Sequence, residues 1–364
     1  MEFAASPFES FFRPEIYDLP AYVAGKRACE SGVIKLASNE SPFPTLPAVQ
    51  AAIQAHLGDV NRYPDMANSL LTSKIAQFHQ LDESYVTISN GSVALIEKIL
   101  SAICTPNSQV VLPWRSFEAY PIAVSMAGAQ AVKVPLRADG NPDLVAMLGE
   151  INARTRAIIV CTPNNPTSSA LNHTELRDFL LQVPPHIPVL LDEAYVEYVE
   201  MDDAVRGVEL VKECANVISL RTFSKAYGLA GLRCGYALAQ PHISQILLKC
   251  LTPFGTNTLA QVAAVAALDS VTEVRRRVEI TKQERANVVN ALCALGWRGG
   301  SPQGNFVWFN LRDEIDGASQ RFTALCEDEG ITVRTFRGEG SRVTIAEPEG
   351  SLRLIRAYSA FRRI

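Results

Sequence analysis

The sequence has few of the features that mark metal-binding, membrane-spanning or nucleic-acid-binding proteins. Only five histidines occur in 364 residues, and none of the eight cysteines forms a Cys-x-x-Cys pair, so no metal site is expected. No run reaches about 18 apolar residues, so no transmembrane helix is expected. The formal net charge is -4 and neither sign forms a long run, which argues against a nucleic-acid-binding surface.

The first residues of the chain and the positions of the cysteines indicate in which compartment the protein is expected. Residues Met1 to Phe12 lack the basic start and apolar core of a secretory signal peptide. Most cysteines lie in apolar stretches, where a free thiol behaves as a small hydrophobic group, and this usage is typical of a reducing environment. We therefore expect a cytoplasmic protein.

Short apolar runs alternate with helical patterns from about Val33 to Leu251. The runs typical of strands are Tyr85–Ile88, Gln109–Leu112, Ala131–Val134, Ala157–Cys161, Pro188–Leu191, Asn216–Leu220 and Cys234–Ala239. Helical patterns, such as Ser92–Ile103 and Glu175–Gln182, lie between them. This alternation predicts an α/β fold whose mostly parallel sheet is covered on both faces.

The pattern changes after Pro253. One long helical stretch, from about Leu259 to Leu295, precedes a group of short strands and helices. These are Phe306–Leu311, Ala318–Glu329, Thr332–Phe336, Arg342–Ile345 and a closing helix from about Ser351. We therefore expect an N-terminal arm over residues 1–33, a large domain over 34–252 and a smaller α+β domain over 253–364.

The segment from Arg221 to Arg233 is the strongest indication of function. It follows an apolar strand, so Lys225 is expected at the carboxyl edge of a parallel sheet, where open α/β folds bind ligands. Thr222 and Ser224 offer hydroxyl groups beside this lysine, and Arg233 offers a planar fork of N–H donors suited to a phosphate. Taken alone, Lys225 is more typical of a solvated surface loop.

Polar residues also follow three other predicted strands. In the string V-L-L-D-E-A-Y, Asp192 follows the apolar strand residues directly, and capping of the next helix is an equal alternative for it. Asn165 lies in the turn C-T-P-N-N-P-T, which can equally be a structural loop. The string from Ser89 to Ala94, S-N-G-S-V-A, begins a helix whose free N–H groups can bind an anion, although a plain helix cap explains it as well.

Together these motifs resemble those of class II pyridoxal-phosphate-dependent aminotransferases, in the histidinol-phosphate aminotransferase-like subfamily. The lysine segment matches the pattern T-x-S-K-x-x-x-L-x-G-x-R without a gap. The resemblance extends from about residue 13 to the end of the chain. It implies the aspartate-aminotransferase-like fold (fold type I), pyridoxal 5'-phosphate as cofactor, and a homodimer with shared active sites.

The resemblance also assigns roles to individual residues. It implies that Lys225 binds the cofactor covalently and that Asp192 pairs with the pyridine nitrogen, which makes the ring an electron sink. Asn165 and Tyr195 match contacts to the phenolic oxygen, and Phe117 matches an aromatic ring stacked on the pyridine. Without this context Phe117 would be read as a core residue.

The phosphate and substrate contacts follow by the same resemblance. The residues expected around the phosphate are Gly91, Ser92, Val93, Thr222, Ser224, Arg233 and, from the neighbouring subunit, Tyr63. The residues expected on the substrate side are Arg342, which matches a bidentate clamp for the substrate carboxylate, together with Arg334, Tyr22 and Asn39. A surface ion pair is an alternative for Arg334. Ser168 stands where most relatives have glycine, which we expect the fold to tolerate.

The reaction is expected to be an amino-group transfer between small-molecule amino acids and 2-oxo acids. The strings W-R-S-F-E, N-N-P-T-S and N-F-V-W favour an aromatic amino acid with 2-oxoglutarate, and histidinol phosphate is the alternative donor. Decarboxylation or β-elimination on the same scaffold stays open, because a fold does not fix a reaction. A DNA-binding regulator that uses the same domain would need an attached DNA-binding module. A dinucleotide-dependent oxidoreductase would need a G-x-G-x-x-G motif after an early strand, and the sequence has none there.

Overall fold

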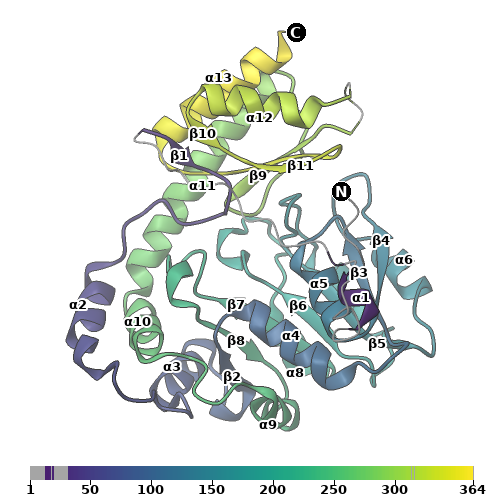
Figure 1. Cartoon of the computed structure of the whole chain (residues 1–364), viewed down its shortest axis with the longest axis vertical. Coiled ribbons are helices and arrows are strands. Elements are labelled where there is room, and N and C mark those ends of the chain that lie inside the picture. Colours follow the sequence, from purple (N-terminus) through teal and green to yellow (C-terminus); the bar gives the residue numbers. More distant parts are fainter. Residues whose placement is uncertain (1–12, 18, 20–31, 313, 315, 364) are drawn as a thin grey trace, which may run out of the picture.

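A large sheet of seven strands and a small sheet of three strands, with a further pair of short strands, organise the described part of the chain (Figure 1). The structure is a computed structural model that describes residues 13–17, 19, 32–312, 314 and 316–363. Its strands are β1 (Ile34–Lys35), β2 (Val86–Ser89), β3 (Gln109–Trp114), β4 (Gln130–Pro135), β5 (Thr155–Cys161), β6 (Val189–Asp192), β7 (Val217–Thr222), β8 (Gly235–Leu238), β9 (Phe306–Asn310), β10 (Ile331–Thr332), β11 (Arg334–Phe336) and β12 (Gly340–Thr344).

The helices alternate with the strands in the first part of the chain and cluster with short strands in the last part. They are α1 (Pro14–Tyr17), α2 (Pro47–Ala55), α3 (Ser69–His79), α4 (Ser92–Ile103), α5 (Ala119–Met126), α6 (Leu144–Gly149), α7 (His173–Leu180), α8 (Gly207–Glu213), α9 (Pro241–Cys250), α10 (Thr258–Asp269), α11 (Val271–Ala294), α12 (Ala318–Asp328) and α13 (Pro348–Arg362). None of the described helices is long and apolar enough to cross a membrane.

The large sheet has the strand order β2-β8-β7-β6-β5-β3-β4. Strand β8 runs antiparallel to both its neighbours, and the other strands run in one direction. The predicted mostly parallel sheet is therefore confirmed, and each of the seven predicted strands is present with small shifts at its ends.

Both faces of this sheet are buried, as its apolar strands require. Along β5, Ile158 and Val160 belong to a core that includes residues of α7, α8 and α10. The alternate residues Ala157 and Ile159 belong to a second core that includes residues of α4 and α5. Because consecutive strand residues point to opposite faces, a strand with helices on both sides must be apolar throughout.

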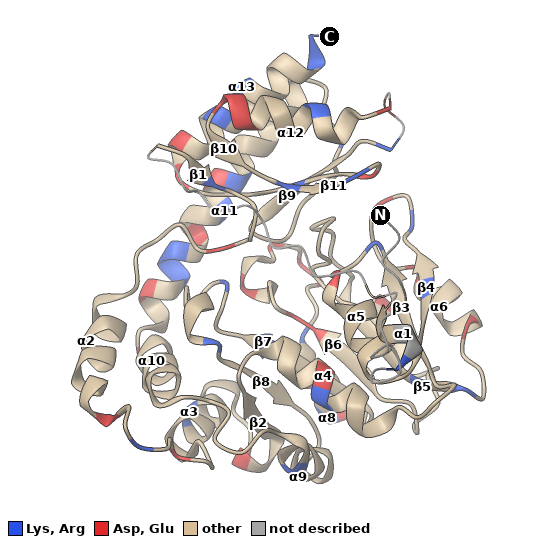
Figure 2. Cartoon of the chain, viewed as in Figure 1, with Lys and Arg blue, Asp and Glu red and all other residues tan. Residues whose placement is uncertain are grey.

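The small sheet is antiparallel, with the order β11-β12-β9. Its core contains Phe309 and Val343 from the strands, and Phe322 and Tyr358 from α12 and α13. Strand β1, from the early chain, pairs with β10 beside this sheet, so two distant segments of sequence meet here (Figure 1). Charged residues of both signs are spread over both parts (Figure 2).

The predicted single helix from Leu259 to Leu295 is wrong, because the chain forms two helices separated at Ser270. The string Asp269-Ser270-Val271-Thr272 contains four consecutive residues of low helix propensity, which makes this the weakest point of the stretch. The two helices also pack differently. Residues of α10 such as Ala263 lie in the core of the large sheet, whereas Leu292 near the end of α11 lies in the core of the small sheet. The predicted domain limits stay predictions, but α10 packs with the part that precedes residue 253.

Candidate active site

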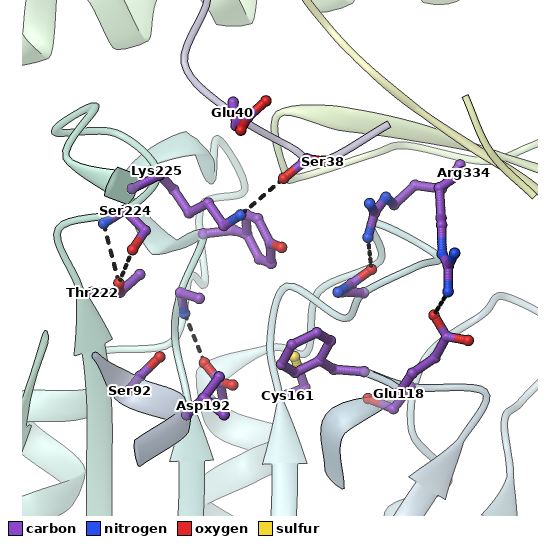
Figure 3. Close-up of a pocket in the computed structure, with 18 of the residues that line it drawn as sticks. Ser38, Glu40, Ser92, Glu118, Cys161, Asp192, Thr222, Ser224, Lys225 and Arg334 are labelled. Carbon is purple, nitrogen blue, oxygen red and sulfur yellow. Dashed lines mark hydrogen bonds and ion pairs between the residues drawn. The ribbon is translucent and has the colours of Figure 1, made fainter. Parts of the chain in front are cut away.

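A cavity of about 300 Å³ opens where strands β5, β6 and β7 end and the small sheet faces them (Figure 3). Cys161 ends β5, Asp192 ends β6 and Thr222 ends β7, and all three line the cavity. The carboxyl ends of parallel strands meet at one edge of a sheet, so this position follows from the topology. Arg334 and Arg342 of the small sheet line the opposite side.

Lys225 extends into this cavity from the turn after β7. Its Nζ donates a hydrogen bond of 3.1 Å to the carbonyl oxygen of Ser38 and lies 5.7 Å from the centroid of the Tyr195 ring. Burial lowers the pKa of Lys225 to about 7, and the nearby Arg342 contributes to the decrease. The lower pKa favours the neutral amine, and this is the form that attacks a carbonyl carbon or accepts a proton.

Asp192 lies buried on the floor of the cavity. It accepts a hydrogen bond of 2.6 Å from the hydroxyl of Tyr120 and one of 3.1 Å from the backbone N–H of Ala194. Burial raises the pKa of Asp192, while the bond from Tyr120 acts in the opposite direction. A buried carboxylate with room in front of it is suited to a cationic ring nitrogen, because such a partner compensates the cost of burying the charge.

The amino end of α4, together with Arg233, forms a cradle for an anion. Gly91 precedes the helix with φ 107°, and no described side chain caps this end. A Cβ atom at Gly91 would lie 2.9 Å from Nη2 of Arg233, so glycine leaves the space between the helix end and the guanidinium open. Arg233 Nη1 also lies 3.5 Å from the hydroxyl of Ser224. Backbone N–H groups, a hydroxyl and an arginine form a donor set that fits a phosphate.

Three further predicted residues surround the middle of the cavity. Phe117 and Asn165 line it, and Tyr195 faces it from the segment after β6. The hydroxyl of Tyr195 accepts a hydrogen bond of 3.1 Å from Asn39, and burial raises the pKa of this tyrosine. These positions agree with a flat ligand ring that lies above Asp192 and beside Lys225.

The small sheet supplies two arginines from neighbouring strands. Arg334 and Arg342 are direct cross-strand partners in β11 and β12. The Arg342 Nη1 donates 2.6 Å to Asn165 Oδ1, and its Nη2 donates 2.6 Å to the carbonyl oxygen of Ala37. Arg334 Nη2 instead lies 2.5 Å from the carboxylate of Glu118 (Figure 3).

Comparison with known proteins identifies the family. The family model described as "Aminotransferase class I and II" matches residues 31–357. The chain belongs to this aminotransferase family. An aromatic amino acid aminotransferase from Thermobifida fusca is 44% identical over 342 residues, which cover 93% of this chain and 94% of that protein. A second, from Streptomyces avermitilis, is 42% identical and covers 96% and 97% of the two chains.

Solved structures support the fold of this aminotransferase. Histidinol-phosphate aminotransferase from Sinorhizobium meliloti, in complex with pyridoxal-5'-phosphate, superposes with a TM-score of 0.88 at 26% identity, covering 97% of this chain and 98% of that one. Aspartate aminotransferase from Thermus thermophilus superposes with a TM-score of 0.79 at 20% identity, covering 90% and 91%. The aspartate-aminotransferase-like fold predicted from the sequence is therefore confirmed.

Most of the predicted site residues meet at the cavity of the aminotransferase. Those that line it are Ser92, Val93, Phe117, Asn165, Asp192, Tyr195, Thr222, Ser224, Lys225, Arg233, Arg334 and Arg342. Gly91 lies next to it at the start of α4, and Asn39 lies fully buried behind Tyr195. The individual roles given to these residues stay predictions.

Of the other predicted residues, Tyr63 lies away from the cavity of its own chain. Tyr63 is 81% exposed and stacks on Phe254, with ring centroids 4.6 Å apart. The contact of Tyr63 to a neighbouring subunit stays a prediction. Tyr22 lies outside the described residues.

The cavity also contains residues that the sequence analysis did not select. Tyr120 contacts Asp192, and Glu118 contacts Arg334. Cys161 lies at the floor of the cavity, close to Tyr120 and Asp192. Glu118 and Tyr120 follow Phe117 by one and three residues in the string W-R-S-F-E-A-Y. Their spacing from Phe117 at the start of a helix was the available signal, but it does not tell which polar group each residue faces.

Ser168 adopts the left-handed conformation that favours glycine, with φ 63°. Its hydroxyl accepts a hydrogen bond of 2.8 Å from the backbone N–H of Gly304, and the residue is fully buried. The serine therefore makes a bond that glycine cannot make, and this offsets part of the strain. The expected tolerance at this position has a local structural reason.

Proposed function

We propose that this aminotransferase moves an amino group between an aromatic amino acid and 2-oxoglutarate, and that Lys225 binds its cofactor, pyridoxal 5'-phosphate. The observation that carries the proposal is the half-buried Lys225, with its pKa lowered to about 7, between a buried carboxylate and an anion cradle. Pyridoxal phosphate supplies an aldehyde that condenses with amines and a protonated ring that withdraws electrons from the substrate's α-carbon.

The residues fit the cofactor group by group. Gly91, Ser92, Ser224 and Arg233 would hold the phosphate, because they present backbone N–H, hydroxyl and guanidinium donors at the start of α4. Asp192 would hold the ring nitrogen as a cation, and Tyr120 keeps the carboxylate oriented.

Lys225 and Arg342 would act on the substrate. In its neutral form, the Nζ of Lys225 can accept the proton from the substrate's α-carbon. It can return a proton to the second substrate in the other half-reaction. Each η nitrogen of Arg342 carries two N–H groups, so the guanidinium can contact a substrate carboxylate while it keeps Asn165 and Ala37 as partners. Such a contact fixes which bond of the α-carbon faces the cofactor.

The donor is proposed from the relatives. Several proteins 41–44% identical over nearly the full chain are named aromatic amino acid aminotransferases, whereas the histidinol-phosphate aminotransferase from Sinorhizobium meliloti is 26% identical. A competition assay tests this choice directly, with phenylalanine and histidinol phosphate as donors and 2-oxoglutarate as acceptor. A specificity constant for histidinol phosphate above that for phenylalanine would reverse the assignment.

We further propose a cytoplasmic homodimer in which Tyr63 reaches the partner's phosphate site. The exposed Tyr63 stacked on Phe254 supports this arrangement. Light scattering combined with a mixing test checks it. Two inactive variants, Lys225→Ala and Tyr63→Phe, should regain part of the activity when their subunits exchange, and an active monomer would contradict the proposal.

A further inference from the structure

The two arginines of the small sheet differ in the groups that face them. Arg334 and Arg342 lie directly opposite each other on β11 and β12, and both line the cavity. Like charges at such positions repel, so each guanidinium needs acceptors close by. Arg342 donates to a neutral amide and a neutral carbonyl oxygen, whereas Arg334 contacts the carboxylate of Glu118.

Glu118 comes from the large-sheet part, at the start of α5 and directly after Phe117. Its side chain is 29% exposed and that of Arg334 is 11% exposed, so the pair forms part of the cavity wall (Figure 3). The nearest other cation is Arg115, with Nη1 at 3.9 Å. Arg115 is itself bonded to Glu339, so the carboxylate of Glu118 remains directed at Arg334.

The surface around this pair is aromatic. The Phe336 ring lies 5.4 Å from the Arg334 guanidinium and 5.2 Å from that of Arg115, and it lines the cavity with Phe117. A neutral aromatic side chain can contact these rings without disturbing the ion pair. The carboxylate of Glu118 lies 2.5 Å from the guanidinium of Arg334. A second anionic group that approaches Arg334 is therefore repelled by this carboxylate.

We propose that Glu118 is a specificity-determining residue, which occupies Arg334 and so disfavours substrates with a second anionic group. This inference rests on the proposed function, because it assumes that Arg342 takes the carboxylate beside the reacting carbon. Glutamate and 2-oxoglutarate carry such a second carboxylate, and the charge of Glu118 opposes its approach to Arg334.

The test uses Glu118→Gln, which keeps the size of the side chain and removes its charge. Glu329→Gln is the matched control, because Glu329 has a side chain 30% exposed, pairs with Arg356 at 2.7 Å and does not line the cavity. Phenylalanine and glutamate are each mixed with the cofactor-loaded enzyme, and the cofactor's absorbance is followed through a single turnover. No acceptor is present, so the two donors are compared alone.

Glu118→Gln should raise the specificity constant for glutamate relative to phenylalanine by about tenfold or more, as expected when a charge-assisted contact to Arg334 becomes available. Glu329→Gln should leave the ratio unchanged, and adding Arg334→Gln to Glu118→Gln should abolish the gain. Glu118→Ala, as a second variant, should shift the ratio in the same direction. An unchanged ratio in both Glu118 variants, or a gain that survives Arg334→Gln, overturns the inference. Failure of the proposed function looks different, since the unmodified enzyme would then not react with phenylalanine.

Discussion

The two sides of the cavity are built in different ways. The cofactor side consists of residues at or just after the ends of neighbouring strands of one sheet, with Asp192 and Lys225 as examples. The substrate side depends on contacts between the two sheets. Arg342 meets Asn165 across 177 positions of sequence, and Arg334 meets Glu118 across 216. We infer that the cofactor side serves every substrate alike, whereas the substrate side distinguishes between substrates.

The largest effect is expected at Lys225. Lys225→Ala removes the amine that binds the cofactor and moves the α-proton, so activity should fall by roughly 10³-fold or more with every donor. Borohydride reduction followed by peptide mapping should find the pyridoxyl group on Lys225 in the unmodified enzyme and nowhere in the variant. Lys249→Ala, at an exposed position of α9, is the control. A pyridoxyl group on another lysine would falsify the assignment of this side of the cavity.

The pH dependence of cofactor capture tests the same lysine. Burial lowers the pKa of Lys225 from 10.5 to about 7, so in the folded protein the neutral amine dominates above pH 7. The rate at which cofactor-free enzyme binds pyridoxal phosphate covalently should therefore rise with pH through about 7 and then level off. A rate that keeps rising toward pH 10 would indicate an ordinary, solvated lysine.

Asp192→Asn should reduce turnover by about 10²–10³-fold, a loss typical of removing one preorganised electrostatic partner. The amide keeps the shape of the carboxylate, so the variant should still bind the cofactor and show its absorbance. The reduction should be equal for phenylalanine and 2-oxoglutarate, because the ring nitrogen takes part in both half-reactions. A loss confined to one substrate would break the distinction between the two sides.

This difference between the sides also explains what could be predicted from the sequence. Strands buried on both faces give continuous apolar runs, so all seven strands of the large sheet were found, and polar residues after them pointed to one edge. The break at Ser270 was missed because helical periodicity continues across it. The partners of Arg334 and Tyr120 depend on how the elements pack in space. The spacing of residues in the sequence does not indicate that Glu118 contacts Arg334 of the small sheet while Tyr120 contacts Asp192 of the large sheet.

Arg342→Lys tests the substrate side. A planar guanidinium offers two parallel hydrogen bonds to a carboxylate, whereas an ammonium acts as a point charge. The specificity constants for glutamate and 2-oxoglutarate should fall by one to two decades, or about 1.5–3 kcal/mol, with the cofactor absorbance retained. Steady-state kinetics on each half-reaction measure this. Unchanged 2-oxo acid kinetics would mean that another residue binds the carboxylate.

The smallest effect is expected at Tyr120, which lies two residues after Glu118 but acts on the cofactor side. Its hydroxyl donates 2.6 Å to Asp192, and this bond lowers the pKa of a carboxyl group that burial raises. Tyr120→Phe removes the bond, so the pKa of Asp192 should rise further and protonation should begin at a higher pH. The acidic limb of the turnover profile should therefore move to higher pH, while turnover near pH 8 stays close to that of the unmodified enzyme. Tyr236→Phe is the control, since Tyr236 is also buried and its hydroxyl bonds to His79 away from the cavity. Because Asp192 is proposed to act on the cofactor and not on the donor, the shift should be the same for phenylalanine and for histidinol phosphate. A shift that differs between these donors would place Tyr120 with Glu118 on the substrate side. The residues at the start of α5 would then all belong to the substrate side of the cavity.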